Sequence, residues 1–160
     1  MAVSEIEALA AALKARSWML ASAESCTGGL IAAACTSLAG SSDWFERGFV
    51  TYSNAAKTEM LGVSAALMEQ HGAVSAEVAR AMADGALARS TARIAVAVTG
   101  IAGPTGGTPA KPVGTVWLAI ARHGATTSAE LLQLRGDRAA VRQQTVEHAL
   151  RALNAALAAA

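Results

Sequence analysis

Cysteine and histidine are scarce in this chain of 160 residues. Its two cysteines, Cys26 and Cys35, are too few for a disulfide scaffold and do not form a CxxC pair. The three histidines, His71, His123 and His148, lie far apart and match no metal-ligand spacing. We therefore expect no metal, no other cofactor and no disulfide framework, and a reducing compartment, the cytoplasm, suits the sequence.

Charge of one sign and long apolar runs are also missing. The formal net charge is +1 and no run of lysine and arginine occurs, so the electrostatic footprint of a nucleic-acid-binding protein is absent. No stretch approaches the roughly 18 apolar residues of a membrane span, and no basic segment followed by an apolar stretch suggests a signal peptide. A small molecule, including a small anion held by a local group of donors, is the expected partner.

Apolar residues make up 53% of the chain, which favours a packed globule, and the length suits a single domain over residues 1–160. Apolar runs predict strands at 18–23, 48–52, 94–98, 116–120 and 131–134, with a hairpin at Gly124. Helical spacing predicts five helices. The first has Ile6, Leu9 and Leu13 inside, the second covers 30–38, and the third follows a Ser53-Asn54 cap and carries Lys57, Met60 and Leu61. The fourth follows Ser75 with Val78, Met82 and Leu87 inside, and the last follows Asp137 with Val146, Leu150, Leu153 and Leu157 inside. This alternation predicts an α/β layered fold with a mixed, mostly parallel sheet.

Three polar segments follow the predicted strands, at residues 24–29, 52–57 and 99–107. In open α/β sheets the carboxyl ends of the strands gather along one edge, and ligands bind there. We therefore expect the three segments to converge on one cleft.

Ser25 lies in the first of these segments, between a strand and a helix. This arrangement can direct backbone N–H groups at a ligand, beside which a serine hydroxyl could act as a nucleophile. The same position also suits a helix cap, and the local sequence is not the Gly-x-Ser-x-Gly elbow, so both interpretations stay open. Cys26 would need a lowered pKa to act as a nucleophile, and no histidine is near it in the sequence.

The other polar residues allow two interpretations each. Lys57 is a solvated surface charge or, if buried, a base of lowered proton affinity, and Tyr52 is a core residue or a site residue. The segment 99–107, which holds four glycines, is an ordinary loop or a place where the backbone approaches a ligand. Arg138 and Arg142, four residues apart, form a solvated helix face or a phosphate site.

Seven ordered motifs between residues 6 and 153 together resemble the CinA C-terminal-domain family. They are AESCTGG at 23–29, GSS at 40–42, VTYSNAAK at 50–57, HGAVS at 71–75, TGIAGP at 99–104, KPVGTV at 111–116 and GDR at 136–138. The family's members are nicotinamide-mononucleotide deamidases, and this chain is similar to their free-standing form, without the separate N-terminal domain of longer members. The resemblance implies a three-layer α/β/α sandwich, a serine amidase that uses no metal, and a homodimer.

The resemblance also assigns roles to residues. It implies that Ser25 is the nucleophile and that Lys57 takes its proton, directly or through Tyr52, while the N–H groups of Thr27 and Gly28 are candidates for the oxyanion hole. The expected substrate-binding residues, with the 100–107 loop and Arg138 at the ribose phosphate, are Thr27, Gly28, Asn54, Thr99, Gly100, Ile101, Gly103, Arg138 and Arg142. Two other functions stay open: a nucleotide-binding module without turnover, and an amidase for another small amide.

Overall fold

The computed structural model describes residues 2–160, with side chains described from residue 5 onward. Its centre is a five-stranded sheet in the order β2-β1-β3-β4-β5. The strands are β1 (Leu20–Glu24), β2 (Phe45–Val50), β3 (Ile94–Gly100), β4 (Thr115–Arg122) and β5 (Ser128–Gln133). β1 pairs in parallel with both β2 and β3, whereas β4 runs antiparallel to β3 and β5. The sheet is therefore mixed, as the sequence predicted, with parallel strands around β1.

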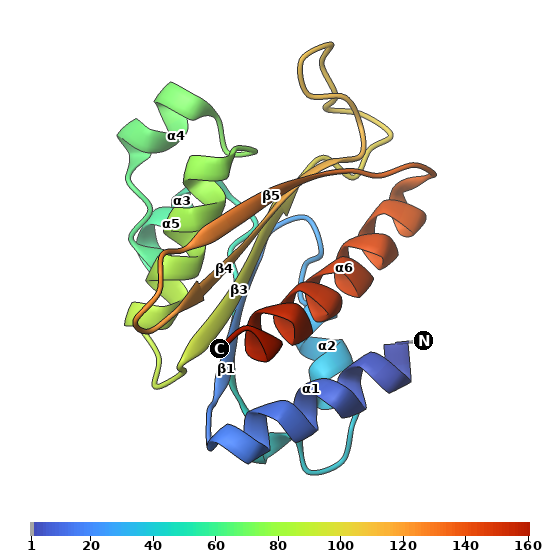
Figure 1. Ribbon diagram of the computed structural model, residues 1–160. Helices are drawn as coiled ribbons and strands as arrows, with labels where there is room; N and C mark the ends of the chain where they lie inside the picture. The colour runs from blue at the N-terminus through green and yellow to red at the C-terminus, as the bar shows by residue number, and fades with distance from the viewer. Residues whose placement is uncertain (1) are drawn as a thin grey trace.

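Helices cover both faces of this sheet, which confirms the three-layer α/β/α sandwich. They are α1 (Ala2–Arg16), α2 (Leu30–Thr36), α3 (Asn54–Leu61), α4 (Ala65–His71), α5 (Ala76–Ala88) and α6 (Arg138–Ala158), with a short 3-10 turn at Ser41–Asp43. Figure 1 shows α1, α2 and α6 on one face and α3, α4 and α5 on the other. The long loop between β3 and β4 projects beyond the end of the sheet, above the start of α6.

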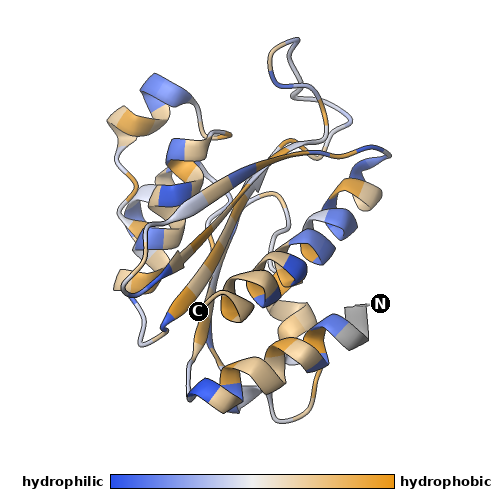
Figure 2. Ribbon diagram, in the orientation of Figure 1, coloured by the Kyte–Doolittle hydropathy of each residue, from blue (hydrophilic) through white to orange (hydrophobic). Residues whose placement is uncertain are grey.

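The two faces of the sheet carry side chains of different size, because successive residues of a strand point to opposite faces. The face under α1, α2 and α6 carries large residues: Leu20, Ile94, Val96, Val98, Val116, Leu118 and Ile120. The face under α5 carries small ones: Ala21, Ala23, Ala95, Ala97, Ala119 and Ala121. These apolar strands form the orange centre of Figure 2. The alanines let α5 lie close to the sheet, and a Cβ at Gly85 of α5 would collide with the Leu61 carbonyl at the end of α3.

Side-chain caps start four of the helices. The hydroxyls of Ser53, Ser64 and Ser75 accept hydrogen bonds from backbone N–H groups of α3, α4 and α5, and the Asp137 carboxylate does so for α6. The predicted caps at Ser53, Ser75 and Asp137 are thereby confirmed. Helix α4 was not predicted, although the Ser64 cap and the left-handed Gly62 that ends α3 separate it from α3.

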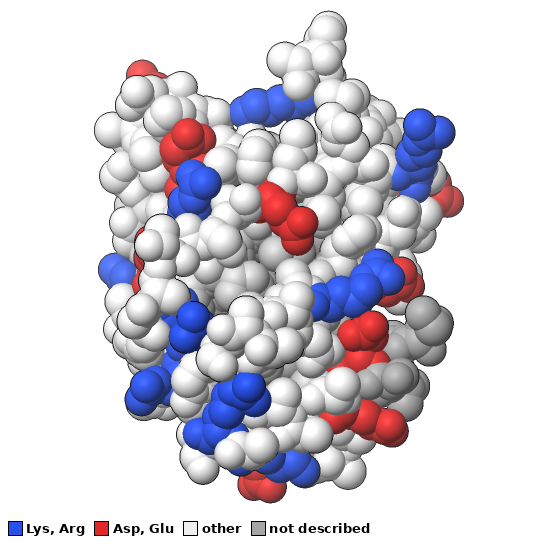
Figure 3. Space-filling view, in the orientation of Figure 1, with Lys and Arg blue, Asp and Glu red and all other residues white. Residues whose placement is uncertain are grey.

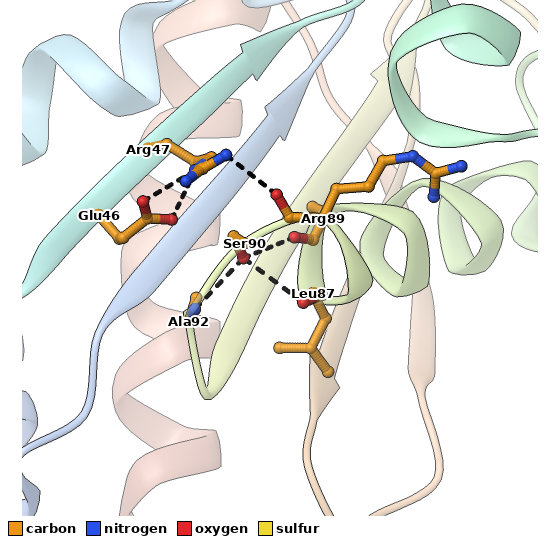
Figure 4. Close-up of polar contacts among 7 residues, drawn as sticks. Glu46, Arg47, Leu87, Arg89, Ser90 and Ala92 are labelled. Atoms are coloured by element: carbon orange, nitrogen blue, oxygen red, sulfur yellow. Dashed lines mark hydrogen bonds and ion pairs between the residues drawn. The ribbon is translucent and has the colours of Figure 1, made fainter.

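The two edge strands begin before their predicted starts. β2 begins at Phe45, three residues earlier than expected, and β5 begins at Ser128. Edge strands are only partly covered, so they tolerate charged residues such as Glu46, Arg47 and Glu130, which hide the apolar pattern. In Figure 4 the Arg47 guanidinium bonds both Glu46 and the carbonyl of Arg89 (3.1 Å), which joins β2 to the end of α5.

Charged residues of both signs are interspersed over the face in Figure 3, without a continuous basic surface. Within residues 2–160, no helix combines the length and the apolar character that crossing a membrane requires.

Candidate active site

The three polar segments converge on one cavity, as the sequence predicted. The cavity has a volume of about 290 Å³ and is lined by Ser25, Cys26, Tyr52, Gly100, Ile101, Ala102, Gly103, Thr105, Gly106 and Arg138. A second cavity of about 500 Å³ lies along the start of α6 and shares Ala102 and Arg138 with the first. The two shared residues make the cavities neighbours, so one elongated ligand could occupy both.

The end of β1 sends two polar side chains into opposite layers. Glu24 is 1% exposed and points to the side of α2, where its carboxylate accepts hydrogen bonds from the N–H groups of Ile31 (2.8 Å) and Ala32 (3.0 Å) and from the Thr27 hydroxyl (2.5 Å). Gly29, the N-cap residue of α2, has no side chain to do this. The N–H groups of Ile31 and Ala32 are thus bonded to the chain's own carboxylate and are not free for a ligand, so any free N–H group must come from the turn before α2.

Ser25, the next residue, points to the side of α3 and is not a helix cap. Its Oγ lies 3.0 Å from Nζ of Lys57, and its N–H continues the sheet by donating to the Val98 carbonyl. Lys57 lies one turn before Leu61 on the inner face of α3 and is 2% exposed, so it is not a surface charge. The structure therefore brings the candidate nucleophile and the candidate base into direct contact.

The surroundings of Lys57 favour its neutral form. Burial lowers the pKa of the Lys57 amine below its ordinary value. Besides the bond to Ser25 Oγ, its Nζ donates hydrogen bonds to the backbone carbonyls of Thr51 (3.1 Å) and Tyr52 (3.3 Å). All three partners are oxygens without a formal charge, so among the described residues no carboxylate partner offsets the effect of burial on the amine.

Cys26 also lines the cavity, but its chemistry is unfavourable for attack. Burial raises the pKa of the Cys26 thiol to about 11, so the thiolate is rare at neutral pH. This agrees with the absence of a histidine partner in the sequence.

Tyr52 occupies a different position from the one expected for a proton relay. Its side chain is 61% exposed, so the core interpretation was wrong, and its hydroxyl accepts a hydrogen bond from Arg138 (3.2 Å). The backbone carbonyl of Tyr52, and not the phenol, contacts Lys57. The direct path from Ser25 to Lys57 is therefore the one with a hydrogen bond.

The loop after β3 forms the opposite wall of the cavity through Gly100, Ile101 and Gly103. A Cβ at Gly100 would lie 2.6 Å from Val116 Cγ2, so only glycine fits there. Two other expected binding residues do not line this wall. Thr99 is buried and its hydroxyl donates to the Ala73 carbonyl (2.9 Å), while Asn54 lies exposed at the start of α3.

Arg138 and Arg142 extend from one face of α6, but they contact different groups. Arg138 is exposed and donates to the Gly103 carbonyl (2.8 Å) and to Tyr52, at the junction of the two cavities. Arg142 is half-buried and donates to the carbonyls of Cys26 and Thr27. Both arginines line the second cavity, but of the two only Arg138 also lines the first, so it lies at the junction of the two cavities.

The turn at 25–29 also separates the two N–H groups expected in the oxyanion hole. The N–H of Gly28 donates to the Ser25 carbonyl (3.1 Å), so it is engaged within the turn. Thr27 is fully buried and does not line the cavity, but among the described residues its N–H donates no hydrogen bond, so it is the one of the two that is left for an oxyanion. Thr27 and Gly28 therefore shape the site through the backbone.

Sequence reasoning missed the role of Glu24. The available signal was a carboxylate at the end of a buried strand, followed by a helix that begins directly after Gly28-Gly29 and so has no capping side chain. Within residues 2–160, no group of three histidine, cysteine, aspartate or glutamate side chains is arranged to hold a metal ion. A serine hydroxyl in contact with a buried amine at the edge of a cavity is an arrangement that suits acyl transfer.

Known proteins resemble this chain in sequence and in fold. Residues 3–157 match the CinA C-terminal domain family. The chain is 56% identical over 142 residues to the nicotinamide-nucleotide amidohydrolase PncC of Enterobacter agglomerans, covering 89% of this chain and 87% of that protein. It is also 56% identical over 133 residues to a CinA-like protein of Akkermansia muciniphila, covering 83% of this chain but 32% of that longer protein. The crystal structure of a CinA superfamily protein from Klebsiella pneumoniae is similar with a TM-score of 0.95 and 39% identity, over 100% of this chain and 99% of that one.

Proposed function

The chain belongs to the CinA C-terminal domain family, and we propose that it hydrolyses nicotinamide mononucleotide to nicotinic acid mononucleotide and ammonia. The observation that carries this proposal is the 3.0 Å contact between Ser25 Oγ and the buried Lys57 Nζ at the edge of a cavity. The name of the Enterobacter agglomerans relative supplies the substrate. The geometry supports an amide bond as the point of attack, since a serine with an adjacent base is suited to acyl transfer.

The proposed reaction has two halves. Ser25 Oγ attacks the carboxamide carbon while its proton moves to the neutral Lys57 amine, and Lys57 then gives this proton to the departing nitrogen, which leaves as ammonia. Water next attacks the acyl-enzyme and passes a proton to Lys57, which returns it to Ser25 Oγ as the ester bond breaks. The Thr27 N–H is the candidate donor to the oxyanion formed in both halves.

The two adjacent cavities suit the two ends of the substrate. The nicotinamide ring would lie in the first cavity, with the carboxamide at Ser25 and the glycine-rich wall against the ring. The ribose phosphate would then extend past Ala102 toward Arg138, whose guanidinium forms the boundary with the second cavity. Anchoring the phosphate would hold the amide at a fixed distance from Ser25.

An ammonia-release assay with purified protein tests the proposal directly. Nicotinamide mononucleotide, nicotinamide riboside and free nicotinamide are compared, each with and without EDTA. We expect turnover to be fastest with the mononucleotide and unchanged by EDTA. Binding of the mononucleotide without ammonia release would instead indicate a nucleotide-binding module. Release from a panel of other small amides, but not from the mononucleotide, would indicate a different amidase.

Replacing Arg138 by alanine should weaken selection for the phosphate. A charge-assisted hydrogen bond contributes about 1.5–3 kcal/mol, so kcat/KM for the mononucleotide should fall about tenfold or more. The riboside, which has no phosphate, should be affected much less. Steady-state kinetics with both substrates measures this difference, and equal losses would place the phosphate elsewhere.

The proposal also covers the location, the partners and the oligomeric state of the protein. We propose that it acts in the cytoplasm as a homodimer, on a nucleotide and on neither nucleic acid nor membranes. Light scattering of the purified protein at several concentrations measures the oligomeric state.

A further inference from the structure

Arg142 contacts the main chain of the turn that carries Ser25. From the second turn of α6, its Nε donates to the Cys26 carbonyl and its Nη2 donates to the Thr27 carbonyl, both at 3.1 Å. These two carbonyls belong to consecutive peptide groups. The guanidinium therefore holds two adjacent peptide planes of the turn from one side.

Holding a carbonyl also fixes the N–H of the same peptide group. In a trans peptide the C=O and N–H bonds point in opposite directions within one plane. With the Cys26 carbonyl turned toward α6, the N–H of Thr27 points away from α6. With the Thr27 carbonyl held in the same way, the N–H of Gly28 also points away, and it indeed donates to the carbonyl of Ser25.

We propose that Arg142 is a positioning residue that aims the Thr27 N–H at the oxyanion formed on Ser25, and that it does not bind the substrate phosphate. This inference rests on the proposed amidohydrolase function, because it concerns the same site. It revises the role expected from the sequence, in which Arg142 was a substrate-binding residue beside Arg138.

The chemistry of the arginine side chain explains why a lysine could not replace it. Guanidinium is planar and presents its N–H groups in a fixed fork, so it can hold two carbonyls in a defined relative orientation. A lysine ammonium is a point charge on a flexible stem and does not fix a plane. The turn itself requires glycine at position 28, because Gly28 has a left-handed φ of 57°.

The test is the variant Arg142→Lys, with Arg142→Gln as a second variant without charge and Arg151→Ala as a matched control on the exposed face of α6. Loss of an oxyanion-hole donor lowers kcat by about 10²–10³-fold, so a misdirected donor should cost at least about tenfold. We expect kcat to fall by this factor for the mononucleotide and for the riboside alike, with KM changed less than about threefold. Arg151→Ala should keep wild-type kinetics.

Ground-state binding separates positioning from substrate contact. Titration calorimetry compares the affinity of Ser25→Ala and of Ser25→Ala/Arg142→Lys for the mononucleotide, and we expect agreement within about threefold. A rise in KM confined to the mononucleotide, with a matching loss of affinity, would assign Arg142 to the phosphate and overturn the proposal. A folded Arg142→Lys enzyme with unchanged kcat would also overturn it. If instead the wild-type protein releases no ammonia from either substrate, the proposed function fails, and not this inference alone.

Discussion

Replacing Ser25 by alanine should lower kcat for nicotinamide mononucleotide by on the order of 10⁴-fold or more, while the affinity for the substrate stays close to that of the wild type. The variant loses the attacking oxygen, and loss of a serine nucleophile typically removes most of the catalysed rate. The cavity is otherwise preserved because the change removes one oxygen atom. Ammonia release and titration calorimetry on the same preparation measure both quantities.

Cys26→Ala is the matched control for this experiment, since the two residues are adjacent and both line the cavity. The raised pKa of the Cys26 thiol leaves it almost entirely protonated, so its removal should keep substantial activity. An inactive Cys26→Ala together with an active Ser25→Ala would exchange the roles of the two residues. Similar moderate losses in both variants would argue against a covalent mechanism.

Lys57→Met should abolish nearly all turnover and remove the rising limb of the pH profile. Lysine in water has a pKa near 10.4, whereas burial lowers the pKa of Lys57, and only the neutral amine can accept the Ser25 proton. In the wild type, log kcat/KM should therefore rise with pH up to an apparent pKa below that of free lysine. Steady-state kinetics from pH 5 to 10 measure this limb.

Lys57→Arg tests whether the residue supplies a base or a charge. Arginine stays protonated at every accessible pH and cannot accept a proton, so this variant should be as inactive as Lys57→Met. An active Lys57→Arg enzyme would show that a positive charge is sufficient. The base would then be sought elsewhere, beginning with the Tyr52 hydroxyl.

The lowered pKa of Lys57 should also make the free energy of unfolding depend on pH. Between the lowered pKa of folded Lys57 and the value near 10.4 of the unfolded chain, the unfolded state binds the extra proton. The free energy of unfolding of the wild type, measured relative to Lys57→Met, should therefore rise with pH across this window. A flat difference would mean that burial does not shift the Lys57 pKa.

The fold could be predicted from the sequence wherever the buried residues of an element form a clear pattern of apolar side chains. Ile94 to Val98 is apolar throughout because β3 is covered on both faces, and Leu150, Leu153 and Leu157 follow the inner face of α6. Helix α4 has no comparable signal because its seven residues bury mainly Met68. Short elements with one buried side chain carry too little periodicity to be recognised.

Some residues of the candidate site could likewise be predicted from the sequence, and others could not. Strand order placed Ser25 and the loop after β3 at one edge of the sheet, but the sequence alone could not distinguish a buried Lys57 from a solvated one. That depends on whether α3 presents Lys57 and Leu61 together to the interior. The partners of Arg142 could not be predicted for another reason. They are backbone carbonyls of a turn more than a hundred residues away, and a backbone carbonyl has no side chain by which the sequence could identify it.

The close approach of α5 to its neighbours connects the packing of the core to the reacting atoms. Gly85 leaves room for the Leu61 carbonyl, and the alanine-covered face of the sheet lets α5 lie deep enough to support α3 from below. Leu61 is one helical turn from Lys57, so the depth of α3 is also the depth of the amine beside Ser25. A single methyl group added at Gly85 would push α3 outward. The Lys57 amine would then move away from Ser25, so added volume between α5 and α3 should lower activity as well as stability.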